Sequence, residues 1–263
     1  FGGGTPGPSG QSTVDRIDYS NDTATAAAKG PLSHTTAYLA ATGNSSFGYF
    51  GGGYGSSTLS TISRIDYSND TATGLEKGPL SLARFRLAAT GNNSFGYFGG
   101  GSPGPRSTVD RIDYSNDTAT ASPKGPLSVA KYSHSATGNQ SFGYFGGGYQ
   151  TVSTVDRIDY SNDTAAAAVK GPLSAGRNQL AASSSRANAI PLENIVNYAA
   201  GTYATPNTGY FAGGQPNVST VDRIDYSNDT ATTSTKGPLS DDNRYLAATG
   251  NDSFGYVGGG QST

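Results

Sequence analysis

R-I-D-Y-S-N-D-T, residues 111–118, decides the fold, because the same stretch occurs five times in the 263-residue chain with almost no change. Each copy leads into K-G-P-L-S, and four of the five follow a segment that reads G-Y-F-G-G-G or G-Y-F-A-G-G. A repeat of about 47 residues is too long for a leucine-rich, ankyrin or tetratricopeptide unit and is typical of four-stranded propeller blades. The copies begin at Arg16, Arg64, Arg111, Arg157 and Arg223, with intervals of 48, 47, 46 and 66 residues.

One repeat contains four short segments with strand character. Leu87–Gly91 is small and apolar, Phe95–Phe98 is aromatic, and Val109–Tyr114 alternates between two faces. Residues 115–118, S-N-D-T, have the chemistry of a tight turn, because Asn and Asp side chains bond back to the nearby backbone. Thr118–Ser122 supplies a fourth, weaker strand before K-G-P. Four strands joined by short connections predict an antiparallel meander, and radial repetition buries each meander against its neighbours.

The order of strands along the chain predicts an all-β fold: a five-bladed β-propeller of four-stranded antiparallel blades. Full blades begin at Leu39, Leu87, Ser135 and Leu180. The residues before Ser33 supply only a third and fourth strand, and 246–260 supply only a first and second. We therefore expect a composite closing blade built from both termini. An open stack, or a section of a larger ring, is the alternative.

We expect residues 1–263 to form a single domain. The fourth repeat carries an insertion at about 185–205, which accounts for the longer interval, and the sequence does not decide from which face it projects. Because the first residue is Phe1 and the chain contains no Met, we expect it to be part of a longer polypeptide.

Composition argues against several classes of function. The net charge of -2 gives no broad basic surface for nucleic acid, so no nucleic-acid partner is predicted. No apolar run is long enough to cross a bilayer, so no membrane insertion is predicted. The absence of Cys removes disulfides and thiolate ligands for zinc, and only two histidines are present. We expect no cofactor and no metal.

The order of motifs resembles that of the kelch-type β-propeller family. In that family a hydrophobic strand ends in a Gly pair, a Tyr-containing strand follows, and a basic residue comes after a Pro-Leu turn. Here residues 97–100 read Y-F-G-G, residues 112–114 read I-D-Y, and Pro126-Leu127 is followed by Lys131. The chain is also loosely similar to kelch-like repeat segments of marine bacteriophage virion proteins and bacterial surface proteins. It departs from the family at the expected tryptophan, where it has Ala26, Gly74, Ala121, Ala167 and Thr233.

Two features of the repeat could be taken for chemical sites. The D-Y-S-N-D block, for example residues 18–22, offers oxygens to calcium, although an Asx-type turn explains the same residues. Arg16 and Asp18 share one face of a strand, which fits either a ring of ion pairs between blades or a charged funnel. Because five identical copies do not build one site from unlike groups, we predict structural roles and no catalytic residues.

The copies differ mainly in two sets of connections, those after the glycine triplet and those after P-L-S. In an up-and-down blade both sets lie on one face, called here the variable face. We predict that it binds a ligand, although unconstrained drift of loops would also produce such variation. The candidate residues are Tyr38, Tyr54, Arg84, Phe85, Arg86, Lys131, Tyr132, Tyr149, Arg177, Asn178, Asn243, Arg244 and Tyr245.

These expectations together describe a non-enzymatic binding or attachment module. Its ligand would be a glycan or a surface protein, with Tyr rings stacking on sugars. The family resemblance implies a tail fibre or another extracellular or virion-surface location, within a larger assembly of domains or subunits. The alternative is a purely structural virion or fibre component that assembles with copies of itself.

Overall fold

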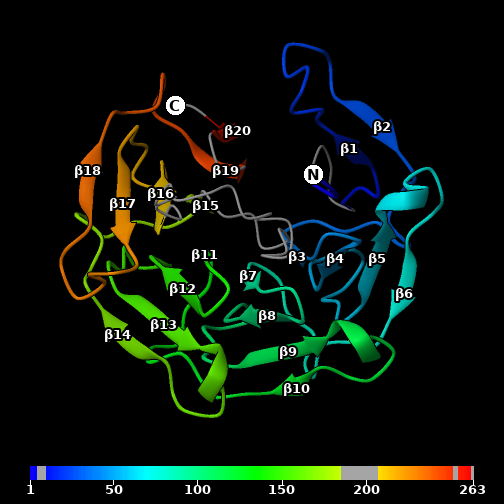
Figure 1. The fold of residues 1–263 in the computed structure, drawn as a ribbon, viewed down its shortest axis with the longest axis horizontal. Coiled ribbons are helices and arrows are strands. Elements are labelled where there is room, and N and C mark those ends of the chain that lie inside the picture. Colours follow the sequence, from blue (N-terminus) through cyan, green and yellow to red (C-terminus); the bar gives the residue numbers. More distant parts are fainter. Residues whose placement is uncertain (5–9, 185–206, 251–253, 262–263) are drawn as a thin grey trace, which may run out of the picture.

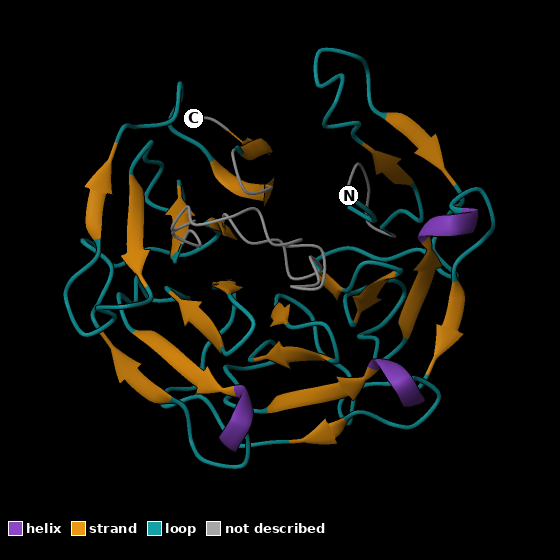
Figure 2. Cartoon of the chain, viewed as in Figure 1, coloured by secondary structure: helices purple, strands orange, loops and turns teal. Residues whose placement is uncertain are grey.

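The computed structural model of the chain describes residues 1–4, 10–184, 207–250 and 254–261. The described residues form six antiparallel sheets around one axis, with the chain running round the ring (Figure 1). Three single-turn 3-10 helices, Tyr67–Asn69, Tyr114–Asn116 and Tyr160–Asn162, are the only helices in this part of the chain (Figure 2). None of them could span a membrane. The predicted all-β propeller is confirmed.

Four of the sheets are complete four-stranded blades, named A to D in chain order. Each has its first strand next to the axis and its fourth strand at the rim (Figure 1). Their strands are β3 (Ala40–Gly43), β4 (Phe47–Gly51), β5 (Ile62–Asp66) and β6 (Leu75–Lys77) in blade A; β7 (Ala88–Gly91), β8 (Phe95–Gly99), β9 (Val109–Asp113) and β10 (Ser122–Pro123) in B; β11 (Ser135–Gly138), β12 (Phe142–Gly146), β13 (Val155–Asp159) and β14 (Ala168–Lys170) in C; and β15 (Ala181–Ser184), β16 (Thr208–Ala212), β17 (Val221–Asp225) and β18 (Ser234–Lys236) in D.

The core of the molecule lies between the blades. In blade B, Tyr97 and Phe98 point to opposite faces of the second strand, and both are fully buried because each face meets a neighbouring blade. Gly99 follows them because a Cβ there would lie 2.7 Å from the Phe145 ring of blade C. The repeated aromatic-glycine sequence therefore brings adjacent sheets close enough to exclude water without a tryptophan.

Polar contacts at the three interfaces between complete blades follow one pattern. Between B and C, Tyr97 stacks on Tyr160 with ring centroids 4.6 Å apart, and its hydroxyl donates to Asp163 over 2.9 Å. Arg111 donates to the same carboxylate over 2.7 Å, and the ammonium of Lys124 lies 3.4 Å from it. Equivalent donors meet Asp117 between A and B and Asp229 between C and D. The repeated Arg is thus structural at these interfaces, as predicted.

The first Asp of the R-I-D-Y-S-N-D-T stretch shares a strand face with the Arg two residues before it, but it does not pair with that Arg. Asp113 does not pair with Arg111; its carboxylate accepts from the amide and hydroxyl of Ser115 over 2.9 and 2.7 Å. Asp18, Asp66, Asp159 and Asp225 do the same with the serine two residues on. The S-N-D-T segment is therefore an Asx-type turn, as predicted.

Protonation of the interface carboxylates should weaken the ring in acid. Burial opposes ionisation of Asp117 and Asp229, but hydrogen bonds from a tyrosine, a lysine and an arginine outweigh it and hold the pKa of each carboxyl below its usual value. Because an unfolded Asp titrates near about 3.9, this stabilisation is complete above that pH. It is lost as the pH falls through the lower pKa of the folded state.

Asp117→Asn tests this dependence, because the amide cannot titrate. We expect the variant to lose about 1.5–3 kcal/mol of stability at pH 7, the usual contribution of hydrogen bonds to a charged group. Urea unfolding at pH 7 down to pH 2 should show a smaller fall in stability for the variant than for the wild type. An unchanged pH profile would mean that Asp117 does not contribute to acid sensitivity.

The two remaining sheets are hairpins at the ends of the chain: β1 (Val14–Arg16) with β2 (Ala27–Lys29), and β19 (Arg244–Gly250) with β20 (Gly255–Gln261). They do not join into the predicted composite closing blade. Gly2 bridges Val14, and the amide of Asp15 donates to the Phe1 carbonyl over 2.9 Å, so the first residues occupy the edge of β1 that β20 was expected to pair with.

The terminal hairpins instead meet as successive blades do. Tyr256 stacks on Tyr19 with centroids 5.6 Å apart and donates to Asp22 over 2.7 Å, while Tyr19 bonds to Thr249. These contacts match the tyrosine contacts between complete blades, where Thr42 of blade A bonds to a tyrosine of blade B. The ring therefore holds four complete blades and two hairpins, and Figure 1 shows the gap between the rims of β18 and β2.

The insertion in the fourth repeat lies in the connection between β15 and β16, so Ala181–Ser184 is the inner strand. Ser184, which ends β15, and Thr208, which begins β16, lie on the face opposite the variable face. Residues 185–206 themselves are outside the described residues.

Candidate ligand-binding site

The two variable sets of connections lie side by side on one face, as predicted. Isolated β-bridges join them: Ala37 pairs with Tyr54, Phe85 with Ser102, and Asn178 with Gln215. These bridges hold the loops against one another by backbone hydrogen bonds and so give the face a fixed shape.

Three of the predicted binding residues are buried beneath this face and cannot reach a ligand. Arg84, Lys131 and Arg177 are at most 1% exposed. Their charged groups lie 2.7, 2.9 and 2.9 Å from buried carboxylates on the third strand of the following blade, those of Asp110, Asp156 and Asp222. The prediction was wrong for these three residues, because a long basic side chain in a loop can turn inward when a carboxylate lies beneath it.

Blade A shows what replaces this ion pair. At the position of Arg84 it has Thr36, and at the position of Asp110 it has Ser63, and both are buried. The Thr36 hydroxyl donates to the Gly52 carbonyl over 3.3 Å, where Arg84 donates to Gly100 over 3.1 Å. Cation and carboxylate are thus exchanged together for two neutral groups. Asn178, only 5% exposed, is likewise structural and was wrongly predicted to bind ligand.

The other predicted residues lie at the surface, and several form aromatic clusters. Phe85 contacts Tyr38 and Tyr54, with ring centroids 6.3 and 5.5 Å away, and the Arg86 guanidinium lies 5.0 Å from the Tyr38 ring. Tyr132 and Tyr149 stack at 4.6 Å in the next repeat. In the last repeat Arg244 lies 5.5 Å from the ring of exposed Tyr245, beside half-buried Asn243.

On the variable face, five equivalent residues, one from each repeat, surround the axis; they are called here the belt. The first four lie two residues before the inner strands of blades A to D, and Tyr245 is the second residue of β19. All five have a left-handed backbone, with φ between 55° and 58°. The amide of each of the last four donates to the carbonyl of the one before it over 2.7–2.9 Å. This conformation is costly for residues with a side chain, at roughly 1–3 kcal/mol each, so the blades must hold it in place. The belt consists of Tyr38, Arg86, Ser133, Gln179 and Tyr245.

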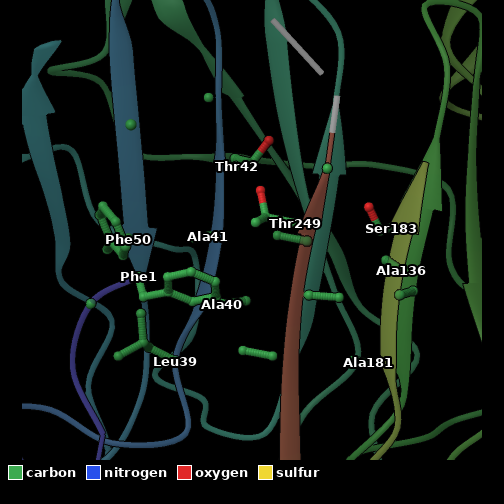
Figure 3. Close-up of a pocket in the computed structure, with 18 of the residues that line it drawn as sticks. Phe1, Leu39, Ala40, Ala41, Thr42, Phe50, Ala136, Ala181, Ser183 and Thr249 are labelled. Carbon is green, nitrogen blue, oxygen red and sulfur yellow. The ribbon is translucent and has the colours of Figure 1, made fainter. Parts of the chain in front are cut away.

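The belt surrounds the mouth of a cavity of about 730 Å³, called here the mouth cavity. A second cavity of about 690 Å³ continues along the axis, since both are lined by Leu39, Leu87, His134 and Leu180. Figure 3 shows the deeper cavity, where the inner strands present small side chains such as Ala41, Ala136 and Ala181. Small residues on the inner strands thus leave open space along the axis of the ring.

The mouth cavity is polar at its rim and carries a positive charge. Among the side chains of the described residues that line it, that of Arg86 is cationic and none is acidic. His134 lies below the rim; burial, with help from nearby Lys131 and Arg84, keeps its pKa well below the usual value, although a backbone contact with Gly99 acts the other way. The imidazole is therefore neutral at physiological pH.

The sequence-based list omitted Ser133, Gln179 and His134. The signal for the first two was their alignment with Tyr38, Arg86 and Tyr245 in the connection that follows P-L-S in each copy. His134 stands where the other repeats have Leu, so the repeat alignment alone could have singled it out.

A comparison with protein-family models found no match for this sequence, and a comparison with curated proteins found none either.

Proposed function

We propose that this propeller is a non-enzymatic attachment module that binds a glycan or a surface protein through the variable face. The observation that carries the proposal is the mouth cavity, rimmed by a belt in which five otherwise similar repeats place four different residue types, Tyr, Arg, Ser and Gln. A kelch-type origin and a place on a virion fibre or cell surface belong to the same proposal.

The chemistry of the face suits a sugar ligand. Tyr38 and Tyr245 expose about two fifths of their surface at the rim and offer apolar ring faces to the C–H faces of a sugar. Gln179 and Ser133 can exchange hydrogen bonds with hydroxyls, and Arg86 can donate to a hydroxyl or carboxylate. Because the belt is fixed by backbone hydrogen bonds, little ordering would be needed on binding.

Binding to a glycan array should depend on the belt. We expect Arg86→Ala and Tyr38→Ala each to weaken binding by about tenfold or more, since truncation of a central Arg or Tyr contact commonly costs 2 kcal/mol or above. Tyr67→Ala is the matched control, because Tyr67 is 51% exposed but follows β5 on the opposite face. Equal binding by all three variants, or no binding to any glycan or surface protein, would contradict the proposal.

A structural role in an assembly of copies is the second candidate. It is favoured by one observation: among the described residues, the outer flank of blade D lacks the neighbour that covers the same flank of blades A, B and C.

A further inference from the structure

The C–D interface defines what a blade's outer flank recognises. Tyr144, Arg157 and Lys170 of blade C place their donor atoms 2.8, 2.7 and 3.2 Å from the carboxylate of Asp229 in blade D. The backbone joins in, since Gly171 donates to the Asp229 carbonyl over 2.7 Å. A tyrosine, an arginine and a lysine thus bind the S-N-D-T turn of the next repeat through one carboxylate.

Blade D has the same three donors with no carboxylate to receive them. Tyr210 pairs with Arg223, and Val221 with Lys236, in the register that blade C uses for its donors. Within the described ranges none of the three makes a salt bridge or a side-chain hydrogen bond. We call Tyr210, Arg223 and Lys236 the free triad.

The glycines beside the triads show that the flank of blade D is open. A Cβ on Gly171 of blade C would lie 1.7 Å from the carbonyl oxygen of Ala231 in the neighbouring blade. Gly30, Gly78 and Gly125 are equally confined, with 1.8–1.9 Å to the corresponding carbonyl. A Cβ on Gly237 of blade D would have no atom within 4 Å.

A free strand edge lies next to this flank. In blade D the second strand, β16, is bonded on both sides, to β15 and β17. The equivalent strand of the C-terminal hairpin is β20. In the part of the chain that the structure describes, it is bonded only to β19, and residues 258–261 are exposed. Asp22 belongs to the N-terminal hairpin, on the other side of the gap from blade D. Its carboxylate accepts from Tyr256 but has no arginine or lysine partner in the described structure.

We propose that the free triad and the edge of β20 form a binding site for one further β-hairpin that carries an R-I-D-Y-S-N-D-T turn. The hairpin's first strand would extend the β19–β20 sheet by strand addition. Its S-N-D aspartate enters the free triad, its tyrosine stacks on Tyr210, and its Arg and Lys reach Asp22. The incoming hairpin thus supplies a carboxylate to the free triad of blade D and an arginine and a lysine to Asp22 of the N-terminal hairpin.

The chain's own N-terminal hairpin is held away from this site. Arg16 and Lys29 lie 2.7 and 3.2 Å from Asp70 of blade A, and Tyr19 is stacked on Tyr256. The three complete interfaces repeat the same tyrosine stacking, with ring centroids 4.6–4.8 Å apart. The N-terminal hairpin makes the corresponding contacts with the C-terminal hairpin, since Asp22 accepts from Tyr256.

A labelled peptide of residues 153–173, the outer hairpin of blade C, tests the proposal against the full-length chain. Fluorescence anisotropy should show saturable binding, and the Asp163→Asn peptide should bind about tenfold to a hundredfold more weakly, as expected for losing hydrogen bonds to a charged group. Arg223→Ala in the protein should cause a similar loss. Arg106→Ala, which changes a cation away from the flank, should leave the affinity unchanged.

Two results would overturn the proposal: no saturable binding of the wild-type peptide, or equal binding of the Asp163→Asn peptide. The first would also be found if the chain's own hairpin filled the site. The assay uses neither glycans nor the belt residues, so its outcome is independent of the proposed attachment function.

Discussion

Arg84→Ala is expected to lower the free energy of unfolding by about 3–5 kcal/mol, the usual cost of removing one partner of a buried ion pair. Arg84 and Asp110 are both fully buried, and the guanidinium also donates to the carbonyls of Gly100 and Thr108. Without it, the Asp110 carboxylate would keep only the Ser81 amide and hydroxyl as donors. Urea unfolding followed by circular dichroism measures the change.

The double variant Arg84→Thr/Asp110→Ser is the decisive comparison, because it copies the residues that blade A already uses. Ser63 accepts from the Ser33 amide over 3.1 Å, just as Asp110 accepts from the Ser81 amide. We expect the double variant to recover most of the stability lost in the single variant. The single variant leaves the Asp110 charge buried without its cation, whereas the double variant removes both charges. If the double variant is nevertheless less stable than Arg84→Ala, the ion pair itself stabilises the fold.

The blades could be predicted from the sequence because each is a local structure. The period, the S-N-D-T turn and the alternating strands all lie within about 47 residues. The direction of a loop side chain depends on a partner from the following blade, as for Arg84 and Asp110, which are separated by two strands. Reading repeats singly therefore placed Arg84 on the surface. Comparing them in pairs would have shown that Thr36 and Ser63 change together.

The ends of the ring were harder to predict for a different reason. Strand count allowed β1–β2 and β19–β20 to make one blade, but the sequence F-G-G-G at residues 1–4 matches the end of a second strand as well as V-G-G-G at 257–260 does. Two segments therefore compete for one edge of β1, and chain connectivity gives residues 1–4 the advantage. Contacts between repeats, and not their number, decide the arrangement of the termini.

Gly171→Ala is expected to destabilise the ring by about 3 kcal/mol, at the upper end of the usual cost of overpacking. The new Cβ would lie 1.7 Å from a backbone oxygen of Ala231, which cannot swing aside as a flexible side chain could. Blades C and D would have to separate, weakening the Gly171–Asp229 hydrogen bond and the contacts of Asp229 with Tyr144 and Arg157. Urea midpoints at constant m-value measure the loss.

Gly237→Ala is the matched control, since it makes the same change in the same K-G-P motif of blade D. With no atom within 4 Å of the new Cβ, the variant should be as stable as wild type or gain about 0.4–1 kcal/mol, because alanine restricts the unfolded chain. A large loss from Gly237→Ala would mean that another hairpin covers this flank in solution. Since the peptide of residues 153–173 would then fail to bind, the two measurements together distinguish an open flank from one that the chain fills itself.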